Sequence, residues 1–333
     1  MSLVLALNAG STSMKFGLYA VGEGNCDELF SDQADSNEIE AISATLAKWP
    51  APDVVGHRVV HGGAKVRDHC LIDDSVIADL EAAKSLAPLH VPPALAGVRF
   101  AQRRYPGLPQ VACLDTAFHA GMPDVAKTYP LPREIRDAGV VRYGFHGLSC
   151  ESIVRQLGTH LPDRVVIAHL GGGCSVTAVR NGCSIDTTMG LTPSGGIMMA
   201  TRTGDLDPGV LIYLMRERGL DAADIEDLID RQGGLLGVSG VSADLRKVRS
   251  ATSDEAKLAL ALFTRSTAKG IAAMLTSLGG ADLLGFTGGI GEHDEEVRAA
   301  IMGDLAWARP ATVKVFPSLE DEEIAHIAYR LAR

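Results

Sequence analysis

The chain has 333 residues, 46% hydrophobic and 22% charged, which is the composition of an ordinary soluble globular protein and predicts two domains at roughly 100–200 residues each. Its formal net charge is −10, from 31 Lys and Arg against 41 Asp and Glu, so the chain repels phosphate backbones at long range. Because only 5% of the residues are aromatic, platforms for stacking bases are scarce as well, and the composition argues against a nucleic-acid-binding protein.

Targeting and redox signals favour a cytoplasmic protein. Residues 1–15 carry no basic leader, and we expect no window with the ~18 apolar residues that a membrane helix needs. The cysteines are scattered and form no C-x-x-C pair, which is typical of a reduced thiol set rather than of a zinc site or a disulfide framework. The six are Cys26, Cys70, Cys113, Cys150, Cys174 and Cys183.

Two hairpin-like units lie about half a chain apart, each with a Gly-containing polar turn between two strands. They comprise Leu3–Leu7, Asn8–Lys15 and Phe16–Val21, then Val165–Ala168, His169–Gly173 and Cys174–Val179. An Asn181-Gly182 turn follows the second unit. The pattern is compatible with an internal duplication, one copy per domain, and equally with two unrelated hairpins.

Strands and helices alternate along the rest of the chain, which predicts an α/β fold. The longest helix, Asp254–Leu278, has Ser253 as its N-cap, acids in its first turn and Gly279-Gly280 as its stop. The other expected strands are Asp53–Val60, Gln110–Leu114 and Asp282–Phe286. The other expected helices are Gly209–Arg218, Ala222–Arg231, a polar helix that ends near Met302, and Glu320–Leu331.

The turn Asn8–Lys15 could bind phosphate. Its glycine lets the backbone approach an anion, the hydroxyls of Ser11 and Ser13 can donate to phosphate oxygens, and Lys15 adds positive charge. It does not match the G-x-x-x-x-G-K-[ST] pattern, so it is no P-loop. A simple polar hairpin turn remains the alternative.

Two charged residues lie in or beside apolar strands. Arg58 would be costly to bury without an anionic partner, which could be a ligand or a structural salt bridge. Asp115 follows the strand Gln110–Leu114, where α/β proteins commonly place their sites, although a helix N-cap has the same spacing.

Three glycine-rich stretches could also carry chemistry. Glycines on both sides of Phe145-His146 leave the imidazole of His146 reachable. The irregular stretch Asp186–Pro208 contains Arg202, and long irregular segments are often functional, although Asp205 and Asp207 suit turns or caps. The loop Thr287–His293 lies between a strand and a helix, an arrangement that points backbone N–H groups at one spot.

Taken together, these residues resemble the acetate kinase family closely. Several motifs occur in family order, which is far more specific than any single loop. The matching stretches are Asn8–Lys15, Gly56–Gly63, Leu86–His90, Asp115–His119, Tyr143–Gly147, His169–Gly173, Asp186–Pro208 and Thr287–Glu292.

The resemblance implies two related actin-like ATPase domains, a ribonuclease H-like duplication with a cleft between them, usually in a homodimer. We expect the domains at residues 1–141 and 142–317, with a C-terminal helix at 318–333 packed back on the first. The implied reaction is the reversible transfer of the γ-phosphoryl group of ATP to acetate with Mg²⁺ (or Mn²⁺), without nucleic-acid or membrane partners.

The resemblance also implies a role for individual residues. Asp115, His146 and Arg202 resemble the catalytic set. The acyl substrate and transferred phosphoryl would contact Arg58, Val60, Leu89, His90, Phe145 and Pro193. The nucleotide would contact Lys15, Ser11, Ser13, His169, Leu170, Gly171, Gly172, Gly173, Asp244, Leu245, Arg246, Gly289, Ile290, Gly291, Glu292 and His293. The metal would be held by Asn8 and by Glu322 of the tail pair Glu322-Glu323.

Chemistry and departures from the family pattern leave several activities open. A carboxylate acceptor has a pKa of ~4–5 and needs no base near pH 7, so Asp115 is expected to orient groups rather than to remove a proton. Gly172 stands where the family usually has Asn, which leaves a changed phosphate donor such as pyrophosphate open. A propionate or butyrate kinase also stays open, as does a nucleotide-binding regulatory module on the same fold.

Overall fold

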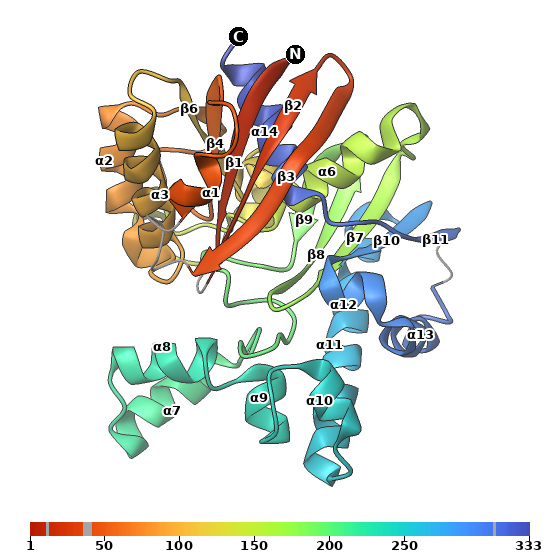
Figure 1. Ribbon diagram of the computed structural model, residues 1–333. Coiled ribbons are helices and arrows are strands. Elements are labelled where there is room, and N and C mark those ends of the chain that lie inside the picture. The colour runs from red at the N-terminus through yellow and green to blue at the C-terminus, as the bar shows by residue number, and fades with distance from the viewer. Residues whose placement is uncertain (11–12, 36–41, 309–310) are drawn as a thin grey trace. The chain divides into compact units, whose positions relative to one another are not determined.

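The computed structural model describes residues 1–10, 13–35, 42–308 and 311–333, and the chain divides into two compact units (Figure 1). The first unit comprises Met1–Ala120, Phe145–Gln156 and Leu319–Arg333, and the second comprises Gly121–Gly144 and Leu157–Ser318. The expected boundary between residues 141 and 142 divides this region once. In the structure the chain passes to the second unit at Gly121, returns to the first at Phe145 and passes to the second again at Leu157.

The first unit is built on a six-stranded sheet with the order β3-β2-β1-β4-β6-β5. Neighbours β1, β2 and β3 pair antiparallel, β4 pairs parallel with β1 and β6, and β5 is antiparallel to β6. The strands are β1 Ser2–Ala9, β2 Ser13–Gly22, β3 Asn25–Asp35, β4 Val54–Val59, β5 Cys70–Leu71 and β6 Gln110–Leu114.

The second unit repeats this topology with five strands in the order β9-β8-β7-β10-β11. Here β7, β8 and β9 pair antiparallel, and β10 pairs parallel with β7 and β11. The strands are β7 Arg164–Leu170, β8 Cys174–Arg180, β9 Cys183–Thr187, β10 Leu283–Thr287 and β11 Thr312–Val315. The same pairing pattern in both sheets favours an internal duplication over two unrelated hairpins.

Helices complete both units. Those of the first unit are α1 Ile42–Leu46, α2 Asp74–Ala82, α3 Val91–Arg104, α14 Glu320–Leu331 and most of α6 Gly147–Leu157. Those of the second are α4 Asp124–Lys127, α5 Arg133–Asp137, α7 Pro208–Arg218, α8 Ala222–Asp230, α9 Gly234–Ser239, α10 Leu245–Ser250, α11 Asp254–Leu278, α12 Gly288–His293 and α13 Glu295–Asp304. Short 3₁₀ turns occupy Lys84–Leu86, Ala117–His119 and Gly158–His160.

Helix α14 packs on the sheet of the first unit. Its apolar residues Ile324, Ala325, Ile327 and Ala328 are almost fully buried in one cluster with residues of β1, β4 and β6. Gly56 of β4 permits this approach, because a Cβ there would lie 2.7 Å from Cγ2 of Ile324. The C-terminal segment is therefore part of the core of the first unit.

Local signals predicted several elements well. Strand β6 and helices α11 and α14 have the predicted bounds, and the Ser253 side chain caps α11 by accepting from the N–H of Ala256. The Asn181-Gly182 turn is confirmed, with φ of 51° and 81°. The loop predicted at Thr287–His293 is wrong in part, since helix α12 begins at Gly288. Strand β3 and helices α3 and α6 were not predicted.

Helix α11 is an exception to the prediction that no segment is long and apolar enough to cross a membrane. By length and composition it could cross one, with a mean hydropathy of 1.2 over its best window. The core helix of a soluble protein passes the same test, and α11 has 44% of that window buried, with Phe263, Ile271 and Met274 among its buried residues. We interpret α11 as such a core helix.

Two buried histidines predict how stability depends on pH. Burial lowers the pKa of His57 and of His119 from 6.5 to about 4. The unfolded chain therefore binds more protons than the folded chain between these values, and stability falls as the pH drops from 6.5 toward 4. We expect each histidine to cost about 1–2 kcal/mol between pH 7 and 5.

Urea unfolding at pH 7 and pH 5 measures this effect. The loss of unfolding free energy between the two should be smaller for His119→Gln than for the unmodified protein. An equal loss in both proteins would contradict the assignment.

Candidate active site

The centre of the candidate site in the first unit is an ion pair between Arg58 of β4 and Asp115, which directly follows β6. Because β4 and β6 run parallel with Val59 opposite Leu114, their carboxyl ends bring the two side chains together. Nε and Nη2 of Arg58 donate to Oδ2 of Asp115 at 2.9 and 2.7 Å. The anionic partner expected for Arg58 is therefore Asp115.

The other carboxylate oxygen of Asp115 has no hydrogen-bond partner among the residues that the structure describes. Oδ1 is fully buried and lacks a hydrogen bond among the described residues, and the side chain as a whole is only 1% exposed. Leaving a buried carboxylate oxygen unpaired costs about 1–3 kcal/mol, so an unsatisfied group of this kind calls for a bound partner such as water, a ligand or a cation.

Asn8 extends the ion pair toward the C-terminal helix. Nη1 of Arg58 donates to Oδ1 of Asn8 at 3.1 Å, and Nδ2 of Asn8 donates to Oδ1 of Asp321 at 2.5 Å. Four side chains, from β1, β4, the end of β6 and α14, thus form one connected polar chain. We call the set Asn8, Arg58, Asp115 and Asp321 the polar chain.

Negative charge exceeds positive charge around the polar chain. Burial raises the pKa of Asp115, and Glu320 raises it further, while Arg58 lowers it only in part. Burial and Glu320 likewise raise the pKa of Asp321, against the opposing effects of Asn8, Lys15 and Arg58. Three acids, Asp115, Glu320 and Asp321, therefore outnumber the two cations Arg58 and Lys15, which favours a bound cation.

The same excess of negative charge raises the pKa of Arg58. Burial alone would lower the pKa of this guanidinium, but the charges of Asp115, Glu320 and Asp321 outweigh burial and hold the pKa above its ordinary value. Arg58 stays protonated, and its positive charge is held at the carboxyl ends of the strands.

The expected metal residue Glu322 lies elsewhere. Its carboxylate pairs with Nη1 of Arg155 at 3.0 Å and lies 3.7 Å from Nε2 of His326. The acid that reaches Asn8 is Asp321, because neighbouring residues point about 100° apart around a helix. Of the two neighbouring acids, Asp321 is therefore bonded to Asn8, and Glu322 is bonded to Arg155.

The segment that carries His146 is joined to Asp115 through the backbone. The N–H of Gly147 donates to the carbonyl of Asp115 at 2.8 Å, and a Cβ on Gly147 would lie 2.3 Å from that oxygen. His146 has a φ of 58°, in the left-handed region that a non-glycine residue rarely adopts. Such strain persists where the surroundings fix the residue, and it is common at functional sites.

Phe145 is fixed by two histidines of the first unit. Its carbonyl lies 3.0 Å from Nε2 of His119, and its ring packs edge-to-face on His61, with centroids 5.5 Å apart. Phe145 is 1% exposed and Val60 4%, so both suit an apolar wall. His90 is the N-cap residue of α3, directly after Leu89.

The predicted phosphate turn is described only in part. Ser11 lies outside the described residues. The carbonyl of Ser13 accepts from the N–H of Gly10 at 2.8 Å, and the side chain of Lys15 is exposed. In the second unit, Nη1 of Arg202 donates to the carbonyl of Pro193 at 3.2 Å.

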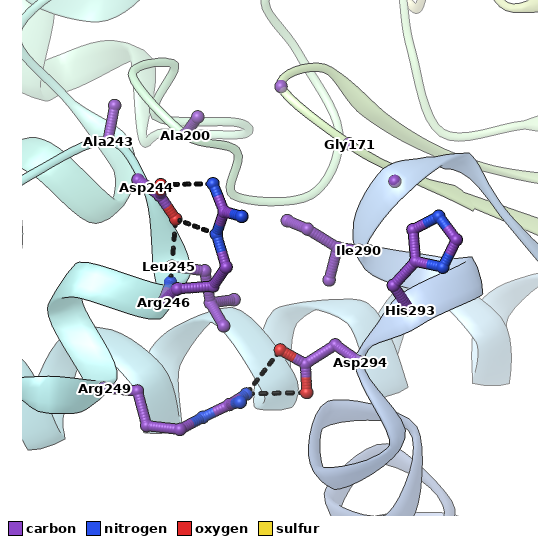
Figure 2. Close-up of a pocket in the computed structure, with 12 residues that line it drawn as sticks. Gly171, Ala200, Ala243, Asp244, Leu245, Arg246, Arg249, Ile290, His293 and Asp294 are labelled. Carbon is purple, nitrogen blue, oxygen red and sulfur yellow. Dashed lines mark hydrogen bonds and ion pairs between the residues drawn. The ribbon is translucent and has the colours of Figure 1, made fainter.

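The second unit contains a cavity of about 590 Å³ that three predicted nucleotide segments line together (Figure 2). The segments come from the turn after β7, the start of α10 and helix α12. The lining residues that the sequence predicted are Gly171, Gly172, Asp244, Leu245, Arg246, Gly289, Ile290 and His293. This volume lies within the range of pockets for drug-sized ligands and nucleotides.

Other predicted nucleotide residues support the cavity wall without lining it. Leu170 is fully buried in β7, and Oε1 of Glu292 accepts from the N–H of Ser318 at 3.0 Å. Gly288, with a φ of 77°, lets α12 start against β7, because a Cβ there would lie 2.7 Å from the carbonyl oxygen of Leu170. The remaining members of this group, His169, Gly173 and Gly291, are also absent from the lining.

Four lining residues were not predicted: Ala200, Ala243, Arg249 and Asp294. Nη2 of Arg249 pairs with Oδ2 of Asp294 at 2.5 Å, and Arg246 pairs with Asp244 at 2.7 Å on the same wall (Figure 2). The sequence signal for Asp294 was its place before the acidic first turn of α13, which is typical of an N-cap. No local sequence pattern connects Asp294 with Arg249, which lies 45 residues earlier in the chain.

Gly172 leaves space at the cavity. A Cβ at this position would meet no described atom within 4 Å. The missing side chain is therefore not a requirement of packing, and the cavity has room for a larger residue there.

The fold class follows from the two sheets of matching topology: it is the α/β actin-like ATPase fold of the acetate and propionate kinases. A profile described as the Acetokinase family matches residues 36–309, and the chain belongs to that family.

Individual relatives agree with this assignment. The chain is 42% identical to an acetate kinase of Rhodopseudomonas palustris, over 92% of this chain and 86% of the relative. It is similar to the crystal structure of Porphyromonas gingivalis acetate kinase, with a TM-score of 0.88, 34% identity and full coverage of both chains. A propionate kinase structure from Francisella tularensis has a TM-score of 0.89 and 32% identity, over 99% of this chain and 100% of that one.

Proposed function

We propose that the chain catalyses the reversible transfer of the γ-phosphoryl group of ATP to acetate, giving acetyl phosphate and ADP. Membership of the Acetokinase family and the 42% identical acetate kinase support this reaction. The observation that carries the proposal is the Arg58–Asp115 ion pair, in which Oδ1 of Asp115 is buried and has no hydrogen-bond partner in the described part of the chain. It offers positive charge for a carboxylate and an acceptor for a ligand in one place.

Arg58 binds the acetate carboxylate in this proposal. Phosphoryl transfer between a carboxylate and a phosphate must bring two anions together, so its cost is dominated by charge and positioning. A guanidinium held by Asp115 and Asn8 supplies fixed positive charge without reorganisation. As the resemblance implies, Val60, Leu89, Phe145 and Pro193 would contact the acyl group, and His90 would contact the transferred phosphoryl group.

Asp115, His146 and Arg202 are the proposed catalytic residues. Asp115 orients the reacting groups, because acetate is already ionised near pH 7 and needs no base. His146 and Arg202 stabilise the charge on the equatorial oxygens during in-line transfer. The strained backbone of His146 supports a fixed, functional orientation of its imidazole.

Mg²⁺ suits the oxygen atoms of the polar chain. Mg²⁺ prefers carboxylate and amide oxygens, which Asn8 and Asp321 offer, with Glu320 one residue before Asp321. Burial, with a smaller contribution from Glu320, raises the pKa values of Asp115 and Asp321, and a bound cation would favour their charged forms. When bound, the ion would neutralise phosphate charge. Mn²⁺ could replace it.

ATP would occupy the cavity of the second unit. Its volume and its walls from Gly171, Asp244–Arg246 and Gly289–Ile290 support this assignment. Arg246 and Arg249 supply positive charge to offset that of the nucleotide.

The proposed assembly is a homodimer. None of the described residues of α7 is buried. Four of its apolar side chains are 41–55% exposed: Val210, Ile212, Tyr213 and Met215. Burial of this surface by a second copy would remove apolar area from water. A cytoplasmic location is part of the proposal, because the cysteines of the described residues are free.

Two observations support alternative activities, on a longer acyl substrate or with a different phosphate donor. The similar propionate kinase structure supports activity on longer acyl chains, since one methylene changes selectivity by only ~1–3 kcal/mol. The open space at Gly172 supports a different phosphate donor. A nucleotide-binding regulatory module would bind ATP without any transfer.

A coupled assay on the purified protein tests the proposed reaction. With ATP, Mg²⁺ and acetate we expect formation of acetyl phosphate, and a lower kcat/KM for propionate and butyrate. Chelation of Mg²⁺ is the control, and pyrophosphate in place of ATP tests the alternative phosphate donor. Binding of ATP with no carboxylate-dependent release of ADP would instead identify a regulatory module.

Arg202→Ala should lower kcat by roughly 10³-fold or more, the scale for an arginine that stabilises a phosphoryl-transfer transition state. Arg231→Ala is the matched control, because Arg231 lies in the same unit and forms an exposed pair with Asp227. A loss below about tenfold in Arg202→Ala would remove Arg202 from this role.

A further inference from the structure

A second group of potential metal ligands lies between strand β3 and helix α14 of the first unit. Cys26 comes from β3, and Glu322 and His326 come from α14. The thiol sulfur, a carboxylate oxygen and an imidazole nitrogen all lie within 4.8 Å of one another, and all three residues are partly buried. None of them belongs to the polar chain or to the nucleotide cavity.

We propose that Cys26, Glu322 and His326 form a binding site for a thiophilic divalent cation such as Zn²⁺. Glu322 and His326 are four residues apart, so they project from one face of α14. Cys26 supplies the third ligand from the strand on which this helix packs. Cys sulfur, His nitrogen and carboxylate oxygen are each zinc ligands, and three protein ligands leave a fourth position open for water or another molecule.

The observed spacing is close to what the ion requires. Zinc bonds of about 2.0–2.3 Å in a tetrahedral arrangement place the ligand atoms roughly 3.3–3.8 Å apart. Nε2 of His326 already lies 3.7 Å from Oε1 of Glu322. The sulfur of Cys26 lies within 4.8 Å of a ligand atom of each of the other two residues, and a change in side-chain torsion angles would close the remaining gap.

Arg155 competes for Glu322 but has a second partner. Its Nη1 lies 3.0 Å from Oε1 of Glu322, while its Nε donates to Oε2 of Glu323 at 2.7 Å. Glu323 therefore keeps Arg155 neutralised when Glu322 turns to a cation. The nearby guanidinium still repels the ion, which makes this a site of moderate affinity.

The site would distinguish its ion from Mg²⁺. A thiol and an imidazole are soft ligands that Mg²⁺ avoids, whereas Asn8 and Asp321 offer hard oxygen atoms only. Burial and Glu322 raise the pKa of the Cys26 thiol to about 12, so the ion must displace its proton on binding. A bound ion would join α14 to β3 next to Asp321.

Co²⁺ is a spectroscopic probe for this site, because a cobalt–thiolate bond gives a charge-transfer absorption band. The reduced full-length protein is titrated with Co²⁺ in excess Mg²⁺. We expect the band to saturate at about one equivalent, with ligand-field bands of a four-coordinate ion, and to disappear when Zn²⁺ is added.

Variants assign the band to its ligands. Cys26→Ala should abolish it, and His326→Gln should weaken Co²⁺ binding at least about tenfold. Cys183→Ala is the matched control, because Cys183 is an exposed cysteine of the second unit, and this variant should retain the full band. If Cys26→Ala does not fold, as judged by circular dichroism, His326→Gln and Glu322→Gln decide the question.

A cobalt–thiolate band of unchanged strength in Cys26→Ala, or no band in the unmodified protein, would overturn the proposal. Neither result bears on phosphoryl transfer, which the acetate assay tests separately. Zn²⁺ should also raise the melting temperature of the unmodified protein and not that of Cys26→Ala.

Discussion

The buried ion pair between Arg58 and Asp115 is the interaction on which the candidate site depends. A largely buried arginine needs an anion, and parallel pairing of β4 and β6 supplies one where the two strands end. The pair then fixes its neighbours. Arg58 donates to Asn8, and the backbone of Asp115 accepts from Gly147, next to the strained His146. Removing either charge would leave the other buried without its main partner.

The sequence predicted elements whose signals are local. Strand β6 is a short apolar run, and α11 has an N-cap serine and a stop of two glycines, so their bounds could be read directly. The need of Arg58 for an anionic partner was also predictable from its apolar surroundings. That the partner is Asp115, 57 residues away, depends on sheet pairing that single-sequence patterns do not specify.

The acid beside Asn8 shows the limit of sequence reasoning. Four acids in a row, Glu320–Glu323, begin α14, and a shift of one residue rotates a side chain by about 100°. The resemblance alone pointed to Glu322, but packing of Ile324 and Ala328 on the sheet turns Asp321 toward Asn8 and Glu322 toward Arg155. Burial of the apolar face, rather than the acidic pattern, decides which carboxylate reaches the site.

The two units share a topology but carry different chemistry. The first holds the polar chain at its strand ends, and the second encloses a cavity with the predicted nucleotide segments in its wall. Helix α14 contributes to two separate groups from neighbouring residues, Asp321 to the polar chain and Glu322 to the group with Cys26 and His326. Helix α14 therefore packs in the core of the first unit and also supplies residues to both proposed metal sites.

The most direct test of the account is the effect of Arg58→Lys on the two substrates. Lysine keeps the positive charge near Asp115 but loses the planar fork that bonds two groups at once. We predict that the KM for acetate rises at least about tenfold while the KM for ATP changes less than about threefold. Equal changes in both constants, or an unchanged KM for acetate, would contradict the claim that Arg58 holds the carboxylate.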